Sequence, residues 1–457
     1  MSAGPESTES TKSTKSTKST KSTKSTKSTV SDRSTRSGPV ITDIAITPVA
    51  IADPPLLNAS GVHEPFQQRS IIQVRTDAGI IGISEAYGDD ATLRQLSQAA
   101  ATLIGLDVFH LNELTRRVTK ALASALASSP TELIGAASAD KTVAQAVSAF
   151  EVACFDAQGK ALGRPVVDLL GGAVRDRVDF SAYLFYKWAE HPGDYPADDW
   201  GAALDPDGIV AQARRMVERY GFKSLKLKGG VFAPDEEIAA VKALRAAFPD
   251  RPVRLDPNAN WSVQTSHRVA AALEGELEYL EDPTPGIQGM AEVSAKTLLP
   301  LATNMCVTGF AEIPEAVRVG AVQVILSDHH FWGGFRASQN LAALCDTFGL
   351  GVSMHSNTHL GISLAAMTHL AAATPNLTYA LDTHSPWKTE EVIAGGPLRF
   401  VDGALAVPEG PGLGVEIDED ALARLHEQYL TCGFRKRDDA SWIRRVQPEF
   451  STKRPRF

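Results

Sequence analysis

The sequence predicts an α/β protein with a (β/α)8-type barrel, preceded by an α+β domain. From about residue 183 onward, short strand patterns alternate with helical patterns, and strand ends recur about every 23 to 28 residues, the usual length of one βα unit. Before that point, strand patterns come first and helical patterns follow without alternation, which is typical of an α+β domain. No GxGxxG motif follows a predicted strand, so a dinucleotide-binding sheet is disfavoured.

The 457 residues are too many for one small core, and they divide into four segments. Repeated Ser-Thr-Lys triplets dominate the start of the chain, which lacks the apolar residues needed to offset the entropy of ordering. We therefore expect a disordered tail there; it has no apolar core of a secretory signal, and an organellar presequence is the weaker alternative. The predicted segments are 1–38 for the tail, 39–175 for an N-terminal α+β capping domain, 176–392 for the barrel, and 393–457 for a segment that returns to the capping domain.

In the N-terminal domain, residues 40–49 alternate as a strand, and residues 70–85 form a hairpin that turns at Asp77–Gly79. Ala- and Leu-rich helical periodicity then covers about 92–170, while the stretch beyond 393 shows short strands and turns. The predicted barrel strands are Ser224–Lys228, Val253–Asn258, Leu277–Glu281, Pro300–Asn304, Val322–Asp328 and Leu350–His355, and predicted helices include Ile209–Tyr220, Asp235–Ala247 and Gln264–Leu273.

Composition excludes several classes of protein. The formal net charge of −9 argues against nucleic-acid binding, which normally requires a basic surface. No apolar run reaches the roughly 18–20 residues needed to cross a bilayer, so we expect no membrane partner. The cysteines are far apart and lack CxxC spacing, which predicts reduced thiols in a cytoplasmic protein. They are Cys154, Cys306, Cys345 and Cys432.

Two lysines on one strand are the first candidate functional residues. Lys226 and Lys228 alternate with leucines, so both lysines point to the same face of the strand. A strand flanked by helices is typically buried, and an inward lysine face then serves chemistry. Neighbouring ammonium groups also lower each other's pKa, which favours a lysine base near neutral pH. The alternative is an exposed edge strand with two solvated lysines.

The later strands also end in polar residues, at the end of the barrel where such enzymes keep their active sites. Asp256, Glu281 and Asn304 end three successive strands, and their hard oxygen donors suit Mg²⁺ better than Zn²⁺. Asp328 and His355 end the next two, and a carboxylate beside an imidazole orients and charges it as a general base. Each residue alone has an ordinary explanation as a turn, a cap or a loop contact. Chance is a poor explanation for five such residues that all stand at the ends of successive predicted strands.

Two competing patterns are weaker. His355 and His359 form an HxxxH pair, but His355 falls at a strand end rather than inside a helix, and no third soft ligand lies near it in the sequence. Gly229-Gly230 follows a strand, but the P-loop spacing is absent, so we interpret it as a turn.

Together these residues resemble the enolase superfamily and, within it, the glucarate dehydratases of the mandelate racemase type. The lysine pair, the three oxygen donors on successive strands and the Asp–His pair match the superfamily's pattern. Longer strings carry the closer resemblance, which covers nearly everything except the Ser-Thr-Lys tail. These strings include Lys-Leu-Lys-Gly-Gly-Val, Asp-Pro-Asn followed by Trp261, Ala-Thr-Asn-Met, His-Phe-Trp, His-Ser-Asn, Asp382-Thr-His384, Gly61-Val-His63 and Pro411-Gly-Leu-Gly-Val-Glu-Ile-Asp.

The resemblance implies the (β/α)7β form of the barrel and a capping domain that the last segment completes. It also implies Mg²⁺ as the cofactor, two bases on opposite faces of the substrate, and a set of substrate contacts. In this sequence the metal ligands would be Asp256, Glu281 and Asn304, the catalytic residues Lys228, Lys226, His355 and Asp328, and the substrate-binding residues His63, Tyr183, Lys226, Asn258, Ser356, His384 and Arg437.

The implied activity is dehydration of D-glucarate, and of its epimer L-idarate, to 5-dehydro-4-deoxy-D-glucarate through an ene-diolate. The alternatives are a dehydratase or epimerase for another aldarate or aldonate, and a weakly active paralogue. The sequence departs from the family's pattern at His329, Thr358, Leu360 and Gly361, and the segment 130–143 does not reproduce its threonine-bearing loop. These departures bear on the substrate more than on the chemistry. We expect a small diacid sugar as the partner, and a homo-oligomer.

Overall fold

The structure is a computed structural model that describes residues 38–123 and 139–457. The Ser-Thr-Lys tail, predicted to be disordered, and most of the segment 130–143 lie outside the described residues. Within the described part of the chain, all four cysteines are free thiols, as the sequence predicts.

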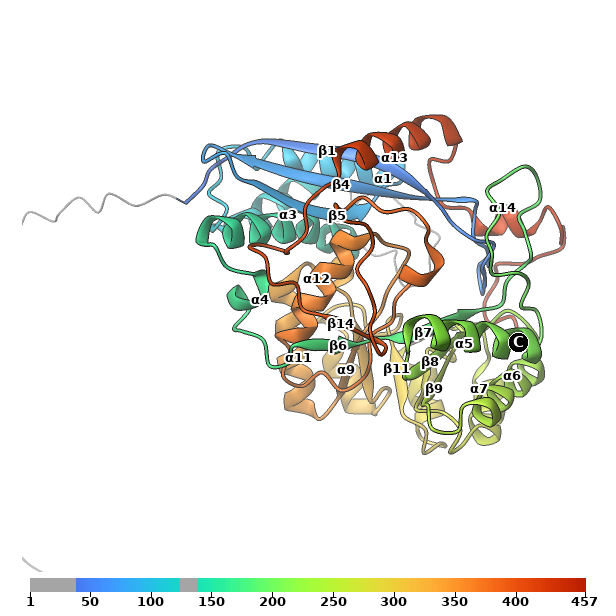
Figure 1. Ribbon diagram of the computed structural model, residues 1–457. Coiled ribbons are helices and arrows are strands. Elements are labelled where there is room, and N and C mark those ends of the chain that lie inside the picture. The colour runs from blue at the N-terminus through green and yellow to red at the C-terminus, as the bar shows by residue number, and fades with distance from the viewer. Residues whose placement is uncertain (1–37, 124–138) are drawn as a thin grey trace, which may run out of the picture. The chain divides into compact units, whose positions relative to one another are not determined.

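The N-terminal domain is a three-stranded antiparallel sheet covered by helices (Figure 1). Its hairpin turns at Asp77–Gly79 as predicted, where Thr76 N donates to Ile80 O at 3.0 Å. The sheet is tied to the longest helix of the domain, because Ile83 N donates to Asp156 Oδ2 at 2.8 Å. The elements are β1 (Ile41–Ala52), β4 (Phe66–Thr76), β5 (Ile81–Tyr87), the small pair β2 (Leu57–Asn58) and β3 (Gly61–Val62), and the helices α1 (Asp90–Ala100), α2 (Leu111–Leu122), α3 (Ala139–Leu162) and α4 (Val166–Leu169).

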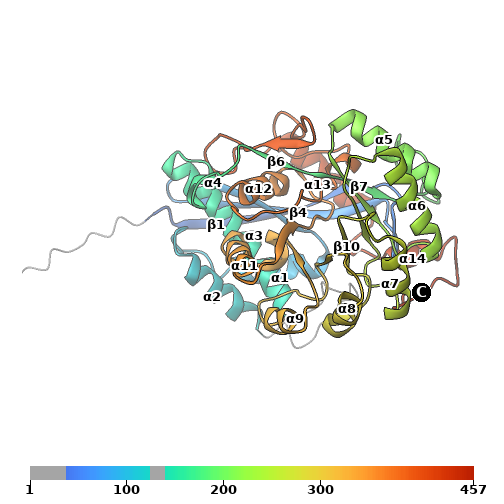
Figure 2. The ribbon, with the colours of Figure 1, turned by 90° about the horizontal axis from the view of Figure 1, so that it is seen from below.

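Seven parallel strands form the barrel sheet in the order β13-β12-β11-β10-β9-β8-β7. Helices surround these strands when the molecule is viewed from below (Figure 2). The strands are β7 (Ser181–Phe185), β8 (Ser224–Lys228), β9 (Val253–Asp256), β10 (Tyr279–Glu281), β11 (Leu301–Thr303), β12 (Val324–Ser327) and β13 (Gly351–Met354), and the helices are α5 (Pro206–Tyr220), α6 (Pro234–Ala247), α7 (Val263–Ala272), α8 (Gly286–Ser294), α9 (Ile313–Val319), α10 (His329–Trp332), α11 (Phe335–Phe348) and α12 (Gly361–Ala372).

The barrel closes through a short eighth strand around Leu381. Ser181 N donates to Leu381 O at 2.7 Å on the β7 side, and Asp382 N donates to Met354 O at 3.0 Å on the β13 side. This closure confirms the (β/α)7β form. It also corrects the predicted strand count, because Ser224–Lys228 is the second barrel strand and β7 is the first. β7 was missed because its sequence, Ser-Ala-Tyr-Leu-Phe, does not alternate polar with apolar residues.

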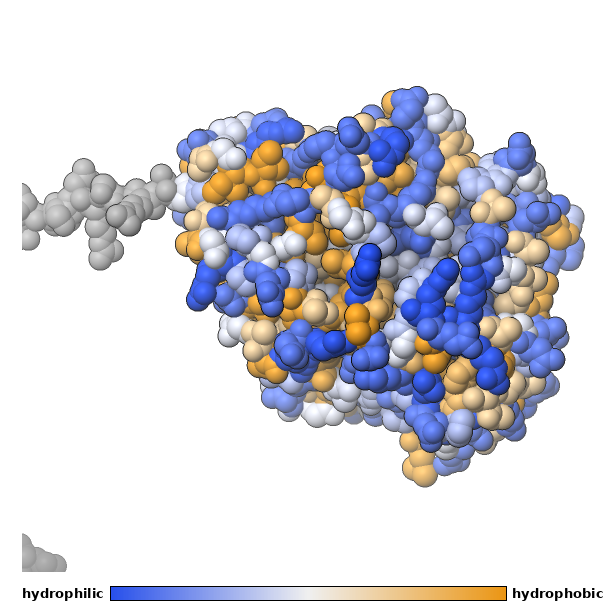
Figure 3. All heavy atoms as spheres, viewed as in Figure 1, coloured by the Kyte–Doolittle hydropathy of each residue, from blue (hydrophilic) through white to orange (hydrophobic). Residues whose placement is uncertain are grey.

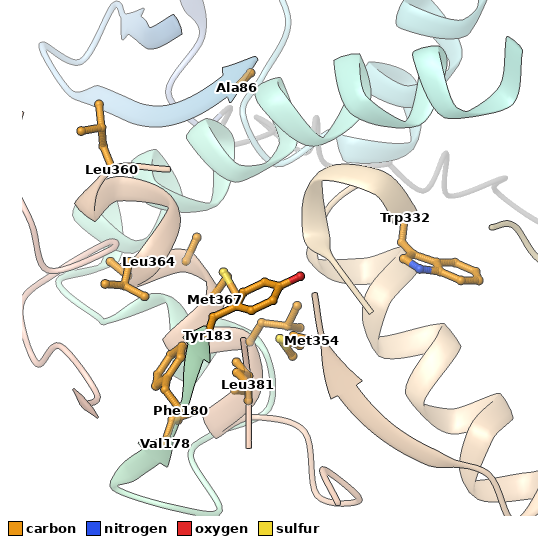
Figure 4. Close-up of a cluster of buried hydrophobic side chains, with 14 of the residues drawn as sticks. Ala86, Val178, Phe180, Tyr183, Trp332, Met354, Leu360, Leu364, Met367 and Leu381 are labelled. Atoms are coloured by element: carbon orange, nitrogen blue, oxygen red, sulfur yellow. The ribbon is translucent and has the colours of Figure 1, made fainter. Parts of the chain in front are cut away.

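Local sequence sets where the helices begin and end. The carboxylate of Asp205 accepts a hydrogen bond from Gly208 N at 2.8 Å, which caps α5, and Pro206 stands in the first turn. Gly221 ends the same helix with a φ of 74°, a left-handed conformation that favours glycine. Tyr183 of β7 lies in a cluster of buried hydrophobic side chains that includes Met354, Met367 and Leu381 (Figure 4).

The prediction of only strands and turns beyond residue 393 is wrong. One short strand, β14 (Ala404–Ala406), pairs with β6 (Arg177–Asp179), but two helices follow, α13 (Glu419–Cys432) and α14 (Asp439–Ile443). The buried residues of α13 recur at helical spacing, a signal that the sequence carried and the prediction overlooked. His426 of α13 bonds to Pro48 O at 2.7 Å, so this helix lies along β1.

Hydrophilic side chains are interspersed with hydrophobic ones on the face shown in Figure 3. Among the residues that the structure describes, none of the helices combines the length and apolar character that crossing a membrane requires.

Candidate active site

The polar residues predicted from strand ends gather at the carboxyl ends of neighbouring barrel strands. The register pairs Phe185 of β7 with Lys228 of β8, and Lys228 with Asp256 of β9. The alternative of an exposed edge strand is wrong, because β8 lies between β7 and β9 and all five of its residues are buried.

The two lysines are held by carboxylates. Lys226 Nζ lies 2.6 Å from Glu281 Oε2, 2.6 Å from Asp382 Oδ2 and 3.7 Å from Asp256 Oδ2. Burial alone lowers the pKa of Lys226, but these carboxylates outweigh burial and raise that pKa well above its usual value. The expectation that the lysines depress each other's pKa is therefore wrong for Lys226. Lys228 Nζ lies 2.6 Å from Asp256 Oδ2.

Three predicted metal ligands supply oxygen atoms in a charged and buried setting. Burial and the charge of Asp256 raise the pKa of Glu281 well above its usual value. Burial also opposes the ionisation of Asp256, but Lys228 and Lys226 lower the pKa of Asp256 to about 2. Glu281 Oε1 and Asn304 Oδ1 are buried and have no hydrogen-bond partner within 38–123 and 139–457. Such unpaired oxygens fit a divalent cation that takes oxygen ligands.

Asp282 orders the third of these ligands, and the sequence analysis did not identify it. Its carboxylate accepts hydrogen bonds from Asn304 N at 2.9 Å and from Thr303 Oγ1 at 2.6 Å. The backbone of Asp282 has a φ of 38°, a left-handed conformation that costs energy outside glycine. The sequence signal that could have identified Asp282 is the Glu-Asp-Pro string at the end of β10, in which only Glu281 was assigned a role.

Asp328 and His355 form the predicted pair. Asp328 Oδ2 lies 3.0 Å from His355 Nδ1, and Asp328 Oδ1 accepts a hydrogen bond from His330 N at 2.8 Å. The ring of His355 stacks on Phe331, with centroids 5.5 Å apart and an interplanar angle of 27°. The carboxylate and the stacked ring together fix the imidazole so that Nδ1 faces Asp328 and Nε2 faces the other way.

Three of the predicted substrate contacts are linked to one another. Ser356 Oγ lies 3.2 Å from His384 Nδ1, and the ring of His384 is 4.9 Å from that of Tyr183. The hydroxyl of Tyr183 donates to Asp256 Oδ2 at 3.4 Å, which joins this group to the metal-ligand set. Burial lowers the pKa of His384 well below its usual value, so this ring is neutral at pH 7.

The other predicted contacts have partners of their own. His63 Nδ1 lies 2.9 Å from Asp53 Oδ2, and its ring packs edge-on against Phe185. Asn258 Nδ2 lies 2.9 Å from Met305 Sδ. Arg437 binds Asp439 through two parallel hydrogen bonds of 2.8 and 2.7 Å, and its remaining Nη1 donates to Gln67 at 3.3 Å. The guanidinium fork is thus already satisfied by a carboxylate of the same chain.

Asp382 is a second residue beside the candidate site that the prediction missed. It is fully buried on the short eighth strand and accepts a hydrogen bond from Lys226 at 2.6 Å. The string Asp382-Thr-His384 marked the position, but its role depends on the closure of the barrel beside β7.

Other groupings of histidines do not make a better metal site. Ligand atoms of Asp328, His329 and His330 lie within 4.8 Å of one another, but Asp328 holds His355 and His330 Nε2 lies 3.5 Å from Arg69. As predicted, His355 and His359 do not share a helix; both lie in the connection between β13 and α12. His329 and Thr358, two residues that differ from the family's pattern, are buried. Their Nδ1 and Oγ1 atoms, respectively, have no hydrogen-bond partner in the described segments.

Comparisons with known proteins agree with this architecture. The family described as "Enolase C-terminal domain-like" matches residues 208–421, and "Mandelate racemase / muconate lactonizing enzyme, N-terminal domain" matches residues 41–171. A Streptomyces coelicolor protein named "Probable glucarate dehydratase" is 57% identical over 420 residues, which span 90% of this chain and 97% of that protein.

Solved structures match over nearly the same range. An enolase from Mycobacterium smegmatis complexed with tartrate has a TM-score of 0.88 and 61% identity, covering 92% of this chain and 99% of its own. An enolase from Pseudomonas fluorescens with bound magnesium, potassium and tartrate has a TM-score of 0.90 and 55% identity, covering 92% and 100%.

Proposed function

Because this chain belongs to the enolase superfamily, with a mandelate racemase / muconate lactonizing enzyme N-terminal domain, we propose that it is a Mg²⁺-dependent acid-sugar dehydratase. The proposed substrate is D-glucarate, with its epimer L-idarate, and the product 5-dehydro-4-deoxy-D-glucarate. The probable glucarate dehydratase at 57% identity and the diacid tartrate in two structural relatives support a diacid substrate.

One arrangement carries the proposal. The strands of the candidate ligands Asp256, Glu281 and Asn304 are neighbours in the sheet, β9 to β11. Lys228 stands on one side of them, at the end of β8, and the Asp328–His355 pair on the other, at the ends of β12 and β13. Two candidate bases therefore flank a cluster of buried oxygen donors.

The difficult step is removal of the proton next to a carboxylate, because it places a second negative charge on that group. Mg²⁺ held by Asp256, Glu281 and Asn304 would, when bound, supply the Lewis acid that stabilises this charge. Lys226 brings a positive charge to the same place, since its Nζ lies 2.6 Å from Glu281 Oε2 and its raised pKa keeps it protonated. Lys226 is therefore proposed as an electrostatic contact rather than a base.

The proton would move to Lys228 from one face of the substrate or to His355 from the other. Bases on two faces allow substrates that are epimers at this carbon to reach the same ene-diolate. The C–O bond to the β-hydroxyl then breaks as the hydroxyl takes up a proton, which protonated Lys228 or His355 can return, and leaves as water. The enol then tautomerises to a ketone. Asp328 holds His355 in the tautomer that accepts a proton at Nε2.

A second candidate within this chemistry is dehydration or epimerisation of another aldarate or aldonate. The observation that favours it is the pair of buried, unpaired polar atoms at two departure positions, Thr358 Oγ1 and His329 Nδ1, close in sequence to His355 and Asp328. Different hydroxyl stereochemistry in the substrate is one way to engage such atoms.

The test is to incubate the protein with Mg²⁺ and D-glucarate in D₂O and to follow keto-acid formation and deuterium at the α carbon. We expect the keto acid, and its loss in the variant His355→Asn. His267→Asn is the matched control, because His267 lies on α7, away from the barrel strand ends, and bonds to Glu292 O at 3.0 Å. If deuterium exchanges but no keto acid forms, the substrate is another acid sugar rather than D-glucarate. If the protein gives no keto acid and no exchange, the glucarate assignment is refuted and a weakly active paralogue is favoured.

A further inference from the structure

The segment Arg454–Phe457 lies against the loop that follows β9. Its backbone pairs with this loop, because Arg456 N donates to Asn260 O at 2.9 Å and Ser262 N donates to Phe457 O at 2.6 Å. Arg456 Nη2 also donates to Gly230 O at 2.6 Å, in the turn after β8. The segment therefore contacts the connections that follow two strands of the candidate active site.

Arg454 joins this loop to the N-terminal domain. Its Nη1 donates to Asn258 O at 2.7 Å, and its Nη2 donates to Ser60 Oγ at 2.6 Å, between β2 and β3. One planar guanidinium thus spans two loops from different domains, a geometry that the single ammonium of a lysine reproduces poorly. Burial lowers the pKa of Arg454 to about 10, which still leaves the group charged at pH 7.

The loop on the barrel side needs such support. Asn258 and Ala259 are consecutive non-glycine residues with φ values of 56° and 57°. A left-handed conformation costs an L-residue conformational energy, least for asparagine, so two in succession persist only where neighbours hold them. Ala259 N donates to Asp282 O at 2.6 Å on one side, and Arg454 binds Asn258 O on the other. This loop begins directly after the candidate ligand Asp256.

The loop on the capping side is held in a similar way. Asn58 Nδ2 donates to Asp439 Oδ2 at 2.8 Å. Gly61 has a φ of 145°, and a Cβ on it would lie 2.3 Å from Asp439 O, so only glycine allows this close approach. Arg454 holds the tip of the same loop at Ser60, and the chain then runs to His63.

We propose that Arg454 is a positioning residue that sets the spacing between the Ser60 loop and the Asn258 loop. By fixing both loops, it places His63 and Asn258 on either side of the substrate site without touching the substrate. The kinetic part of this inference rests on the proposed function, whereas the structural part does not.

The structural part is tested by hydrogen exchange of the full-length protein, measured by mass spectrometry. In Arg454→Gln we expect amide exchange in peptides covering 57–63 and 257–262 to quicken at least tenfold, with the barrel strands β10 to β12 unchanged. Lys453→Gln is the matched control, because Lys453 is the exposed neighbour in sequence. Unchanged exchange in either loop would overturn the proposed bridge.

A second measurement uses Ser60→Ala and the double variant with Arg454→Gln. If one guanidinium links the loops, each single change quickens exchange in both loops, and the double variant adds little to Arg454→Gln. Fully additive effects would show that Arg454 supports each loop separately and would refute the bridge. These variants also distinguish local release from global misfolding, since Ser60→Ala removes only one hydroxyl.

The kinetic part uses whichever acid sugar the wild-type protein turns over. Misplaced loops weaken substrate binding, so Arg454→Gln should raise KM about tenfold while kcat falls less than threefold, and Arg454→Lys should recover part of the loss. A loss of folded protein alone would lower kcat and leave KM unchanged, which would refute the positioning role. If the wild-type protein turns over no acid sugar, the proposed function fails, and the exchange data still decide whether the bridge exists.

Discussion

Asp328→Asn tests the reasoning about the general base with a change of almost no volume. In the structure, Asp328 Oδ1 accepts a hydrogen bond from His330 N, and Oδ2 faces His355 Nδ1 at 3.0 Å. Only the oxygen of an asparagine can satisfy His330 N, so its amide nitrogen would face the imidazole. That nitrogen is a donor, which obliges His355 to carry its proton on Nε2, the atom that must accept one from the substrate.

Because a donor then faces the imidazole in place of an acceptor, we expect His355 to remove the α-proton more slowly. A positioned general base typically contributes about 10²–10⁴-fold to the rate, and a wrong tautomer removes most of this contribution. A hydrogen bond to His355 is retained, so the free energy of unfolding should change by only about 1 kcal/mol. We expect α-proton exchange of the epimer that reacts at His355 to fall about 10²–10⁴-fold.

The assay follows deuterium incorporation from D₂O into each of two epimeric acid sugars by NMR. Exchange of the epimer that reacts at Lys228 should stay within about threefold of the wild-type rate, and it serves as the internal control. An equal loss for both epimers would mean that Asp328 supports the whole site rather than one base. No loss for either epimer would remove His355 from its assigned role.

Three further predictions concern stability, and denaturant unfolding checks each of them. Glu237→Gln should lower the free energy of unfolding by about 1–3 kcal/mol, because Glu237 accepts hydrogen bonds from Gly230 N, Val231 N and Phe232 N and an amide has only one acceptor atom. An unchanged unfolding midpoint would contradict this account. Gly61→Ala should cost at least about 2 kcal/mol, since the added Cβ would lie 2.3 Å from Asp439 O, whereas Gly79→Ala, which also has a positive φ (74°) but meets nothing within 4 Å, should cost less. Burial raises the pKa of Glu64 from 4.5 to about 7, so the folded state binds this proton more tightly than the unfolded state. Its contribution is therefore full below pH 4.5 and is lost as the pH rises through 7, by roughly 2 kcal/mol, and Glu64→Gln should flatten this slope.

The sequence predicts the barrel well where alternation or periodicity is strong. β8 is found at the predicted residues, Ser224–Lys228, because leucines and lysines alternate there. The first and eighth strands escaped prediction for physical reasons. The sequence of β7 does not alternate polar with apolar residues, and the strand at Leu381 is held by only a few backbone hydrogen bonds, so neither presents a two-residue period.

For the site, chemistry-bearing residues could be predicted because parallel strands all end at the same edge of the barrel. The charge state of Lys226 could not, since it depends on Asp382, which is 156 residues away and reaches the lysine only when the barrel closes. Arg437 is a different case, because its carboxylate partner Asp439 stands only two residues later, a local pair that the prediction overlooked. Sequence shows which groups are present, whereas partners that neutralise them depend on tertiary contacts.

The packing of α13 along β1 has a consequence for how the protein is made. The barrel has all of its strands once Asp382 has left the ribosome, but β1 then still lacks the helix that covers it. The capping sheet is synthesised early and must wait, with apolar surface exposed, for the residues of α13 to emerge. We therefore expect the first domain on the ribosome to be the last to fold, and chaperones that bind nascent chains to find it in the interval.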